Sequence, residues 1–70
     1  MITTFEVKIH FGKAVSMFWD WACIIDPIGE RVCNITLFGQ ETLDRFKQAT
    51  EEQGITYKLV KKVGLNEDPT

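Results

Sequence analysis

The sequence predicts an α+β domain: a four-stranded mixed sheet with one helix packed on one face, in the order strand-strand-strand-helix-strand. Three observations predict this class. Apolar and polar residues alternate strictly from 5 to 11, a turn signal at 26–29 separates two apolar runs, and an apolar stripe of helical period runs through 40–53. We expect residues 1–64 to form a single domain, near the lower size at which one core supports a fold, and residues 65–70 to fray as a C-terminal tail.

The composition is that of a globular chain, with 44% hydrophobic and 26% charged residues, and it argues against intrinsic disorder. Eight basic residues stand against ten acidic ones, giving a net charge of −2, whereas nucleic-acid binders usually carry a basic excess. The N-terminal segment alternates in polarity, unlike a signal peptide, and the apolar runs are too short to span a bilayer. We therefore expect a cytoplasmic protein without membrane association, whose two cysteines are thiols.

The first predicted strand covers residues 5–11. A period of two places alternate side chains on opposite faces of a sheet, so its apolar set is expected in the core: Phe5, Val7, Ile9 and Phe11. Gly12 ends this strand. A three-residue loop, 12–14, is expected next, because a loop of two residues would bring the apolar positions of the two strands to opposite faces.

The segment 15–25 is ambiguous, since its apolar residues fit one face of a helix as well as a strand. A strand is favoured because its Trp, Phe, Cys, Ile and Val residues suit pleated surfaces. The following Asp26-Pro27-Ile28-Gly29 is also a strong turn, which needs a strand on each side. Residues 31–38 would be the partner strand. The resulting register places Cys23 opposite Cys33, Phe18 opposite Phe38 and Ile24 opposite Val32, with Trp19 and Trp21 on the covered face.

Residues 40–53 are predicted to form the helix, with Leu43 and Phe46 on its apolar stripe and Gly54 ending it. The last strand is predicted at 55–63, with four residues directed inward: Ile55, Tyr57, Leu59 and Val63. The helix joins the third strand to the fourth by a crossover, so these two strands run parallel, and the first strand is expected to run parallel to the third as well. The fourth strand beside the first gives the favoured order 3-2-1-4; its place beside the third is the alternative.

No group of residues predicts a catalytic centre, a metal site or a cofactor site. Cys23 and Cys33 are expected face to face within bridging distance, yet two buried thiols are favoured over a redox switch or half of a metal site. His10, the one histidine, would lie near Ser16 and Asp20 on the outer face, an arrangement that suggests a hydrolase. Because neither an oxyanion hole nor a glycine-rich elbow accompanies it, a solvated strand face is favoured.

The outer face of the sheet is the candidate binding surface. One helix covers only one face of so small a sheet, which leaves apolar side chains exposed on the other, and such patches commonly mark association surfaces. Six residues are assigned to this partner-binding surface: Phe18, Asp20, Ile24, Val32, Asn34 and Phe38.

The sequence therefore predicts a non-catalytic protein-binding module, acting as an adapter, an accessory subunit or an inhibitor of a larger protein, or as a homodimer. No cofactor is expected. One alternative is weak nucleic-acid binding through Lys58, Lys61 and Lys62, which the net charge disfavours. A small hydrolase at His10 is the least favoured interpretation.

Overall fold

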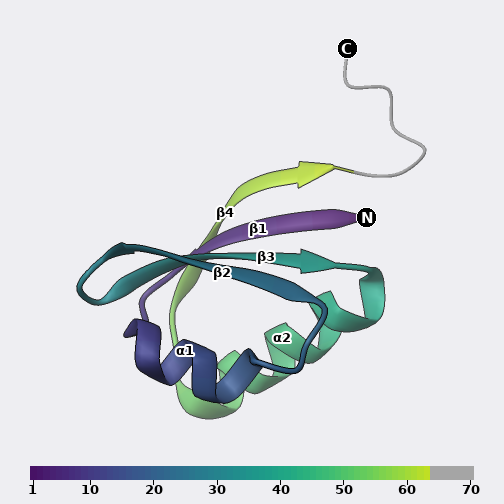
Figure 1. Ribbon diagram of the computed structural model, residues 1–70. Coiled ribbons are helices and arrows are strands. Elements are labelled where there is room, and N and C mark those ends of the chain that lie inside the picture. The colour runs from purple at the N-terminus through teal and green to yellow at the C-terminus, as the bar shows by residue number, and fades with distance from the viewer. Residues whose placement is uncertain (64–70) are drawn as a thin grey trace.

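In the computed structural model, which describes residues 1–63, six elements follow one another as strand, helix, strand, strand, helix and strand (Figure 1). They are β1 (Ile2–Val7), α1 (Phe11–Phe18), β2 (Cys23–Gly29), β3 (Val32–Phe38), α2 (Gln40–Gln53) and β4 (Tyr57–Val63). The frayed tail expected at 65–70 lies outside the described residues. Neither helix in the described part has the length or the apolarity to cross a membrane.

The four strands form one sheet in the order β2-β3-β1-β4, and every neighbouring pair is antiparallel. The α+β class and the place of the last strand beside the first, at an edge of the sheet, are as predicted. Within the sheet, β3 rather than β2 is the other neighbour of β1, and the 1–4 pair is antiparallel instead of parallel. This succession and order define the ferredoxin-like, or split β-α-β, arrangement.

A second helix accounts for these differences. The strand predicted over residues 15–25 is wrong: the chain forms α1 up to Phe18 and enters β2 only at Cys23. Ala14 and Phe18, four residues apart, are both fully buried on one side of α1, so tertiary packing overrides the β propensity of the segment. The expected loop at 12–14 is likewise part of this helix. Phe11, predicted to be buried, begins α1 and is 41% exposed.

The β2–β3 hairpin turns later than predicted. Gly29 pairs with Val32, so the turn lies at residues 30–31 rather than at 26–29. Pro27 is part of β2, as an edge strand allows, and a bulge follows it. Packing favours glycine at position 29, because the Cβ of any other residue there would lie 2.6 Å from Cγ1 of Val32.

This turn moves the register by four residues. Cys23 pairs with Leu37 and Cys33 with Pro27, so the predicted opposition of the two cysteines is wrong. Because the displacement is even, the residues that do pair in β2 and β3, such as Ile24 and Asn34, stay on their predicted faces of the sheet.

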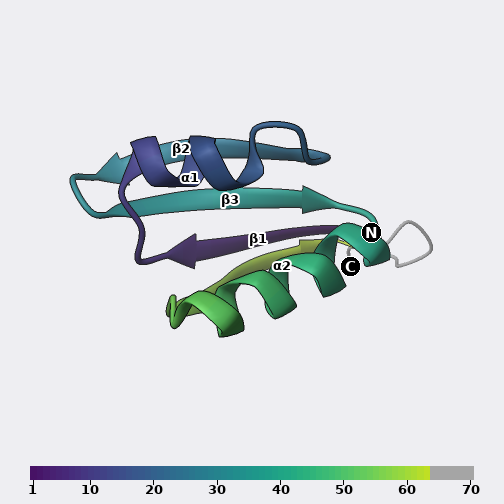
Figure 2. The same ribbon diagram turned by 90° about the horizontal axis from the view of Figure 1, so that it is seen from below.

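Both helices cover the same face of the sheet, with α1 lying across β2 and β3 and α2 on the side of β1 and β4 (Figures 1 and 2). The core between them is aromatic. Phe46 of α2 stacks on Phe5 of β1 with ring centroids 5.2 Å apart, and it meets Phe18 of α1 at 5.6 Å. Tyr57 of β4 contacts both Phe5 and Phe46 edge-on. The predicted burial of Leu43 and Phe46 on α2 is confirmed.

The two tryptophans differ in how far they are buried. Trp21 is half-buried, packs edge-on against Phe18 at 4.7 Å and lies 4.2 Å from the guanidinium carbon of Arg45. Trp19 is 74% exposed, so its predicted place on the covered face is wrong. The physical reason is the helix: Trp19 is the residue that ends α1, not an inward position of a strand.

Candidate functional site

The candidate site is the uncovered face of the sheet, which we call the outer face. Buried and partly exposed residues alternate along β1 and β3, so the even-numbered residues of both strands lie on the outer face. Thr4 and Thr36, which pair across these central strands, share a hydrogen bond of 2.9 Å between their hydroxyl oxygens. This bond separates an apolar end of the face from a polar end.

The apolar end is formed by four side chains from all four strands, which we call the apolar patch: Ile2, Ile24, Phe38 and Val63. Ile2 pairs with Phe38 on one side and with Val63 on the other. Ile24, at the edge of the sheet, pairs with Thr36 in the next row. The exposed fractions are 57% for Ile24, 40% for Val63 and 38% for Phe38, so these apolar groups remain in contact with water.

The polar end carries charges of both signs. Glu6 pairs with Asn34 and with Lys58, and Nζ of Lys58 lies 3.4 Å from Oε2 of Glu6. On the other side Asn34 pairs with Asp26. Oδ1 of Asn34 is buried without a hydrogen-bond partner among the described residues.

Four of the six residues assigned to this surface lie on the outer face: Ile24, Val32, Asn34 and Phe38. Phe18 does not. It is fully buried in α1 against the core, because the segment is a helix rather than a strand. Asp20 is also off the sheet, since it lies in the exposed connection between α1 and β2. Neither residue belongs to the candidate site.

Two residues of the apolar patch were missed by the sequence reasoning. Ile2 was missed because the alternation was read from Phe5, although β1 begins at Ile2. Val63 was predicted to point inward, and a bulge in the β1–β4 pairing between Thr4 and Phe5 reverses the faces of the residues that follow it. As a result Val63 pairs with Ile2 on the outer face. Extending the period of two from Phe5 back to Ile2 would have placed Ile2 on the outer face. The position of a bulge cannot be predicted from the sequence in the same way.

The lysines of β4 do not share one face. Lys58 pairs with Glu6 and Lys61 with Thr4, both outer-face positions, while Lys62 pairs with Thr3, which points to the core. The outer face of the central strands β1 and β3 carries a single aromatic side chain, Phe38. Single-stranded nucleic acids are usually held by several stacked aromatic groups and a continuous basic groove. The outer face of β1 and β3 presents one such aromatic group, and the β4 lysines are divided between the two faces.

His10 has a structural role in the fold. It is the N-cap of α1, and its Nδ1 accepts a hydrogen bond of 3.1 Å from the Gly12 main-chain nitrogen. The first hairpin, which was expected to bring Ser16 and Asp20 near His10, is replaced by α1. The grouping on which the hydrolase interpretation depends is therefore not formed by strand pairing.

The two cysteines are free thiols on the covered side of the sheet, and each Sγ donates a weak hydrogen bond to a main-chain oxygen. Burial raises the pKa of the Cys23 thiol, and the carboxylate of Asp20 raises it further. The pKa of Cys33 is raised in the same way by burial and then by Asp26. Both are therefore protonated at neutral pH, which disfavours a thiolate nucleophile or metal ligand.

Within residues 1–63 no three His, Cys, Asp or Glu side chains stand close enough together to hold a metal ion. Comparisons with protein-family models, with curated proteins and with solved structures gave no match.

Proposed function

We propose that this chain is a non-catalytic protein-binding module that docks through the outer face of its sheet. The observation that carries the proposal is the apolar patch, in which Ile24, Phe38 and Val63 keep 38–57% of their surface in water on a face that neither helix covers. Removing such side chains from water contributes about 25 cal/mol per Å² of apolar surface. A partner protein supplies the surface that the fold itself does not.

The size of a stable interface indicates that the polar end takes part as well. A specific interface buries about 800 Å² on each partner, which is more than four partly exposed side chains provide. The Glu6–Lys58 pair, Asn34 and Asp26 would then form the polar rim that surrounds an apolar centre in most interfaces.

The test compares two phenylalanines of nearly equal exposure, Phe38 at 38% on the outer face and Phe11 at 41% on α1. Phe38→Glu places a charge in the apolar patch, where docking would bury it without a counter-charge at a cost of several kcal/mol. Phe11→Glu is the matched control away from the patch. Ile24→Glu, at an edge position with 57% exposure, is a second outer-face variant in case Phe38→Glu fails to fold.

Association is measured in two ways, by light scattering after size-exclusion chromatography for self-association and by photo-crosslinking for other partners. A photoreactive amino acid at position 38 is expected to crosslink a partner in lysate of the source cells, and one at position 11 is not. The outer-face variants are expected to lose association while keeping their circular dichroism spectra, and the Phe11 variant is expected to keep both. Folded outer-face variants that associate as well as the unmodified chain would refute the proposal.

A further inference from the structure

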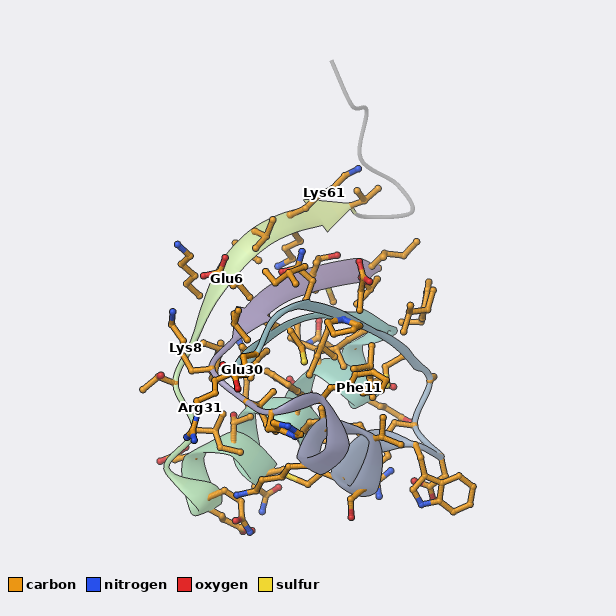
Figure 3. All side chains as sticks on the ribbon, turned by 60° about the vertical axis from the view of Figure 1, so that its left-hand side comes forward. Glu6, Lys8, Phe11, Glu30, Arg31 and Lys61 are labelled. Atoms are coloured by element: carbon orange, nitrogen blue, oxygen red, sulfur yellow. The ribbon has the colours of Figure 1, made fainter. Side chains whose placement is uncertain are left out.

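A second surface feature lies at the end of the sheet, away from the apolar patch. An open hollow of about 400 Å³ is lined by residues from three separate segments: Lys8, Ile9, His10, Lys13, Arg31 and Ile55. Figure 3 shows Lys8 and Arg31 at the same end of the molecule. Ile9 is 4% exposed and Ile55 is partly buried, so the hollow has an apolar floor beneath a basic rim.

The hollow is positively charged, although the chain as a whole is negatively charged. The chain has a net charge of −2, yet three of its eight Lys and Arg residues line this hollow and no carboxylate does. Glu30 precedes Arg31 and lies near it in Figure 3. Among residues 1–63, however, the side-chain ion pair within 4.0 Å is the one between Lys58 and Glu6. Lys8, Lys13 and Arg31 therefore keep their charge available to a ligand.

His10 and the first turn of α1, which also border the hollow, favour an anionic ligand as well. Nδ1 of His10 accepts a hydrogen bond from Gly12, so the neutral ring carries its proton on Nε2, as a donor. The first turn of α1, which begins beside the hollow, contains no acidic residue, and the helix dipole there adds positive potential. An arginine fork and two lysines are the groups that proteins use most for phosphate.

We propose that this hollow binds a phosphorylated small molecule, with the phosphate between Lys8, Lys13 and Arg31 and the body of the ligand over Ile9 and Ile55. A volume of about 400 Å³ is at the lower end of small-molecule sites, which suits a nucleoside monophosphate or a sugar phosphate. The site is separate from the outer face, so it goes beyond the protein-binding function proposed above.

The test is titration of the ¹⁵N-labelled protein with inorganic phosphate, with AMP and with a ten-nucleotide single-stranded DNA. Saturable shifts of the amide signals of Lys8, Ile9, His10, Lys13 and Arg31 are expected with phosphate and more strongly with AMP. The double variant Lys13→Gln/Arg31→Gln should bind AMP at least about a hundredfold more weakly, because each of the two lost charged hydrogen bonds contributes about tenfold or more. Lys61→Gln/Lys62→Gln removes the same charge from β4 and should change the affinity less than about twofold.

Three results would overturn the proposal. The first is shifts that do not saturate with either phosphate or AMP. The second is an equal loss of affinity in both double variants, which would show that only the overall charge matters. The third is DNA binding that is much tighter than AMP binding and moves the signals of Lys58 and Lys61, which would indicate a nucleic-acid surface instead. Because the apolar patch is unchanged in every variant, failure here leaves the protein-binding proposal intact.

Discussion

Phe18 is the residue at which the strand and helix interpretations of the segment 15–25 differ most in energy. As a strand residue it lies on the outer face, where truncation costs little. In the structure it is fully buried, with its ring 4.7 Å from that of Trp21 and 5.6 Å from that of Phe46. Replacing a buried phenylalanine by alanine costs about 3–5 kcal/mol, since both the transfer energy and the contacts around the cavity are lost.

This cost is large for so small a chain. A domain of 70 residues has a free energy of unfolding of about 3–10 kcal/mol. Each kcal/mol lost lowers the melting temperature of such a domain by about 4–8 °C. Phe18→Ala is therefore expected to lower the melting temperature by at least about 12 °C, or to prevent folding altogether.

The measurement is thermal and urea unfolding followed by circular dichroism, with Phe38→Ala as the control. Phe38 keeps 38% of its surface in water, so its truncation should cost no more than about 1–2 kcal/mol. Equal destabilisation by the two substitutions, or a larger effect at Phe38, would refute the inward position of Phe18 and with it the packing of α1.

Four further outcomes follow from the structure. Trp19, at 74% exposure, should give fluorescence that acrylamide quenches readily, so Trp19→Phe should leave a less quenchable signal from Trp21. Equal quenching in the Trp19→Phe and Trp21→Phe variants would contradict these positions. Cys23, partly exposed, should react with iodoacetamide before the fully buried Cys33, and intact-mass analysis should show a singly modified species first; peptide mapping that finds Cys33 modified first would contradict this order. The pKa values of both thiols are higher in the folded chain than in the unfolded one, so their contribution to stability is complete below the ordinary thiol pKa of 9.0 and is lost as pH rises through the raised values. Urea unfolding at pH 8 and at pH 10 should show this loss of stability. Replacing both cysteines by alanine should make the difference between the two pH values smaller. His10→Ala removes the cap of α1 and should lower the free energy of unfolding by about 0.5–2 kcal/mol in urea titrations, whereas no change would show that the cap is dispensable.

Local patterns were sufficient for the elements whose sequences carry one period. The alternation at Phe5, Val7 and Ile9 predicted three buried positions, and the structure places all three in the core. The helix at 40–53 was predicted with its observed bounds, and Gly54 ends it in the left-handed conformation with φ of 68°. In both cases only one secondary structure buries the apolar residues, so the sequence determined the element without knowledge of its neighbours.

The candidate site was predictable in part for the same reason. Ile24, Asn34 and Phe38 were assigned to the outer face even though the register was displaced, because a displacement of four residues preserves the alternation of faces. Val63 required the bulge in the β1–β4 pairing, and the basic hollow required three separate segments to meet around Lys8. Neither feature is encoded by residues that are close in sequence.

Only the tertiary structure decided the fate of residues 11–22, which were predicted as a strand end, a loop and, from residue 15, a segment that fits a helix and a strand alike. Four strands spaced about 4.8 Å apart make a sheet roughly 15–20 Å wide, whereas one helix with its side chains covers about 10–12 Å. With α2 on the side of β1 and β4, the buried faces of β2 and β3 need a second cover. As a helix, the segment supplies it through Ala14 and Phe18, both fully buried. The choice of helix thus follows from the width of the sheet, a property of the assembled strands and not of the segment itself.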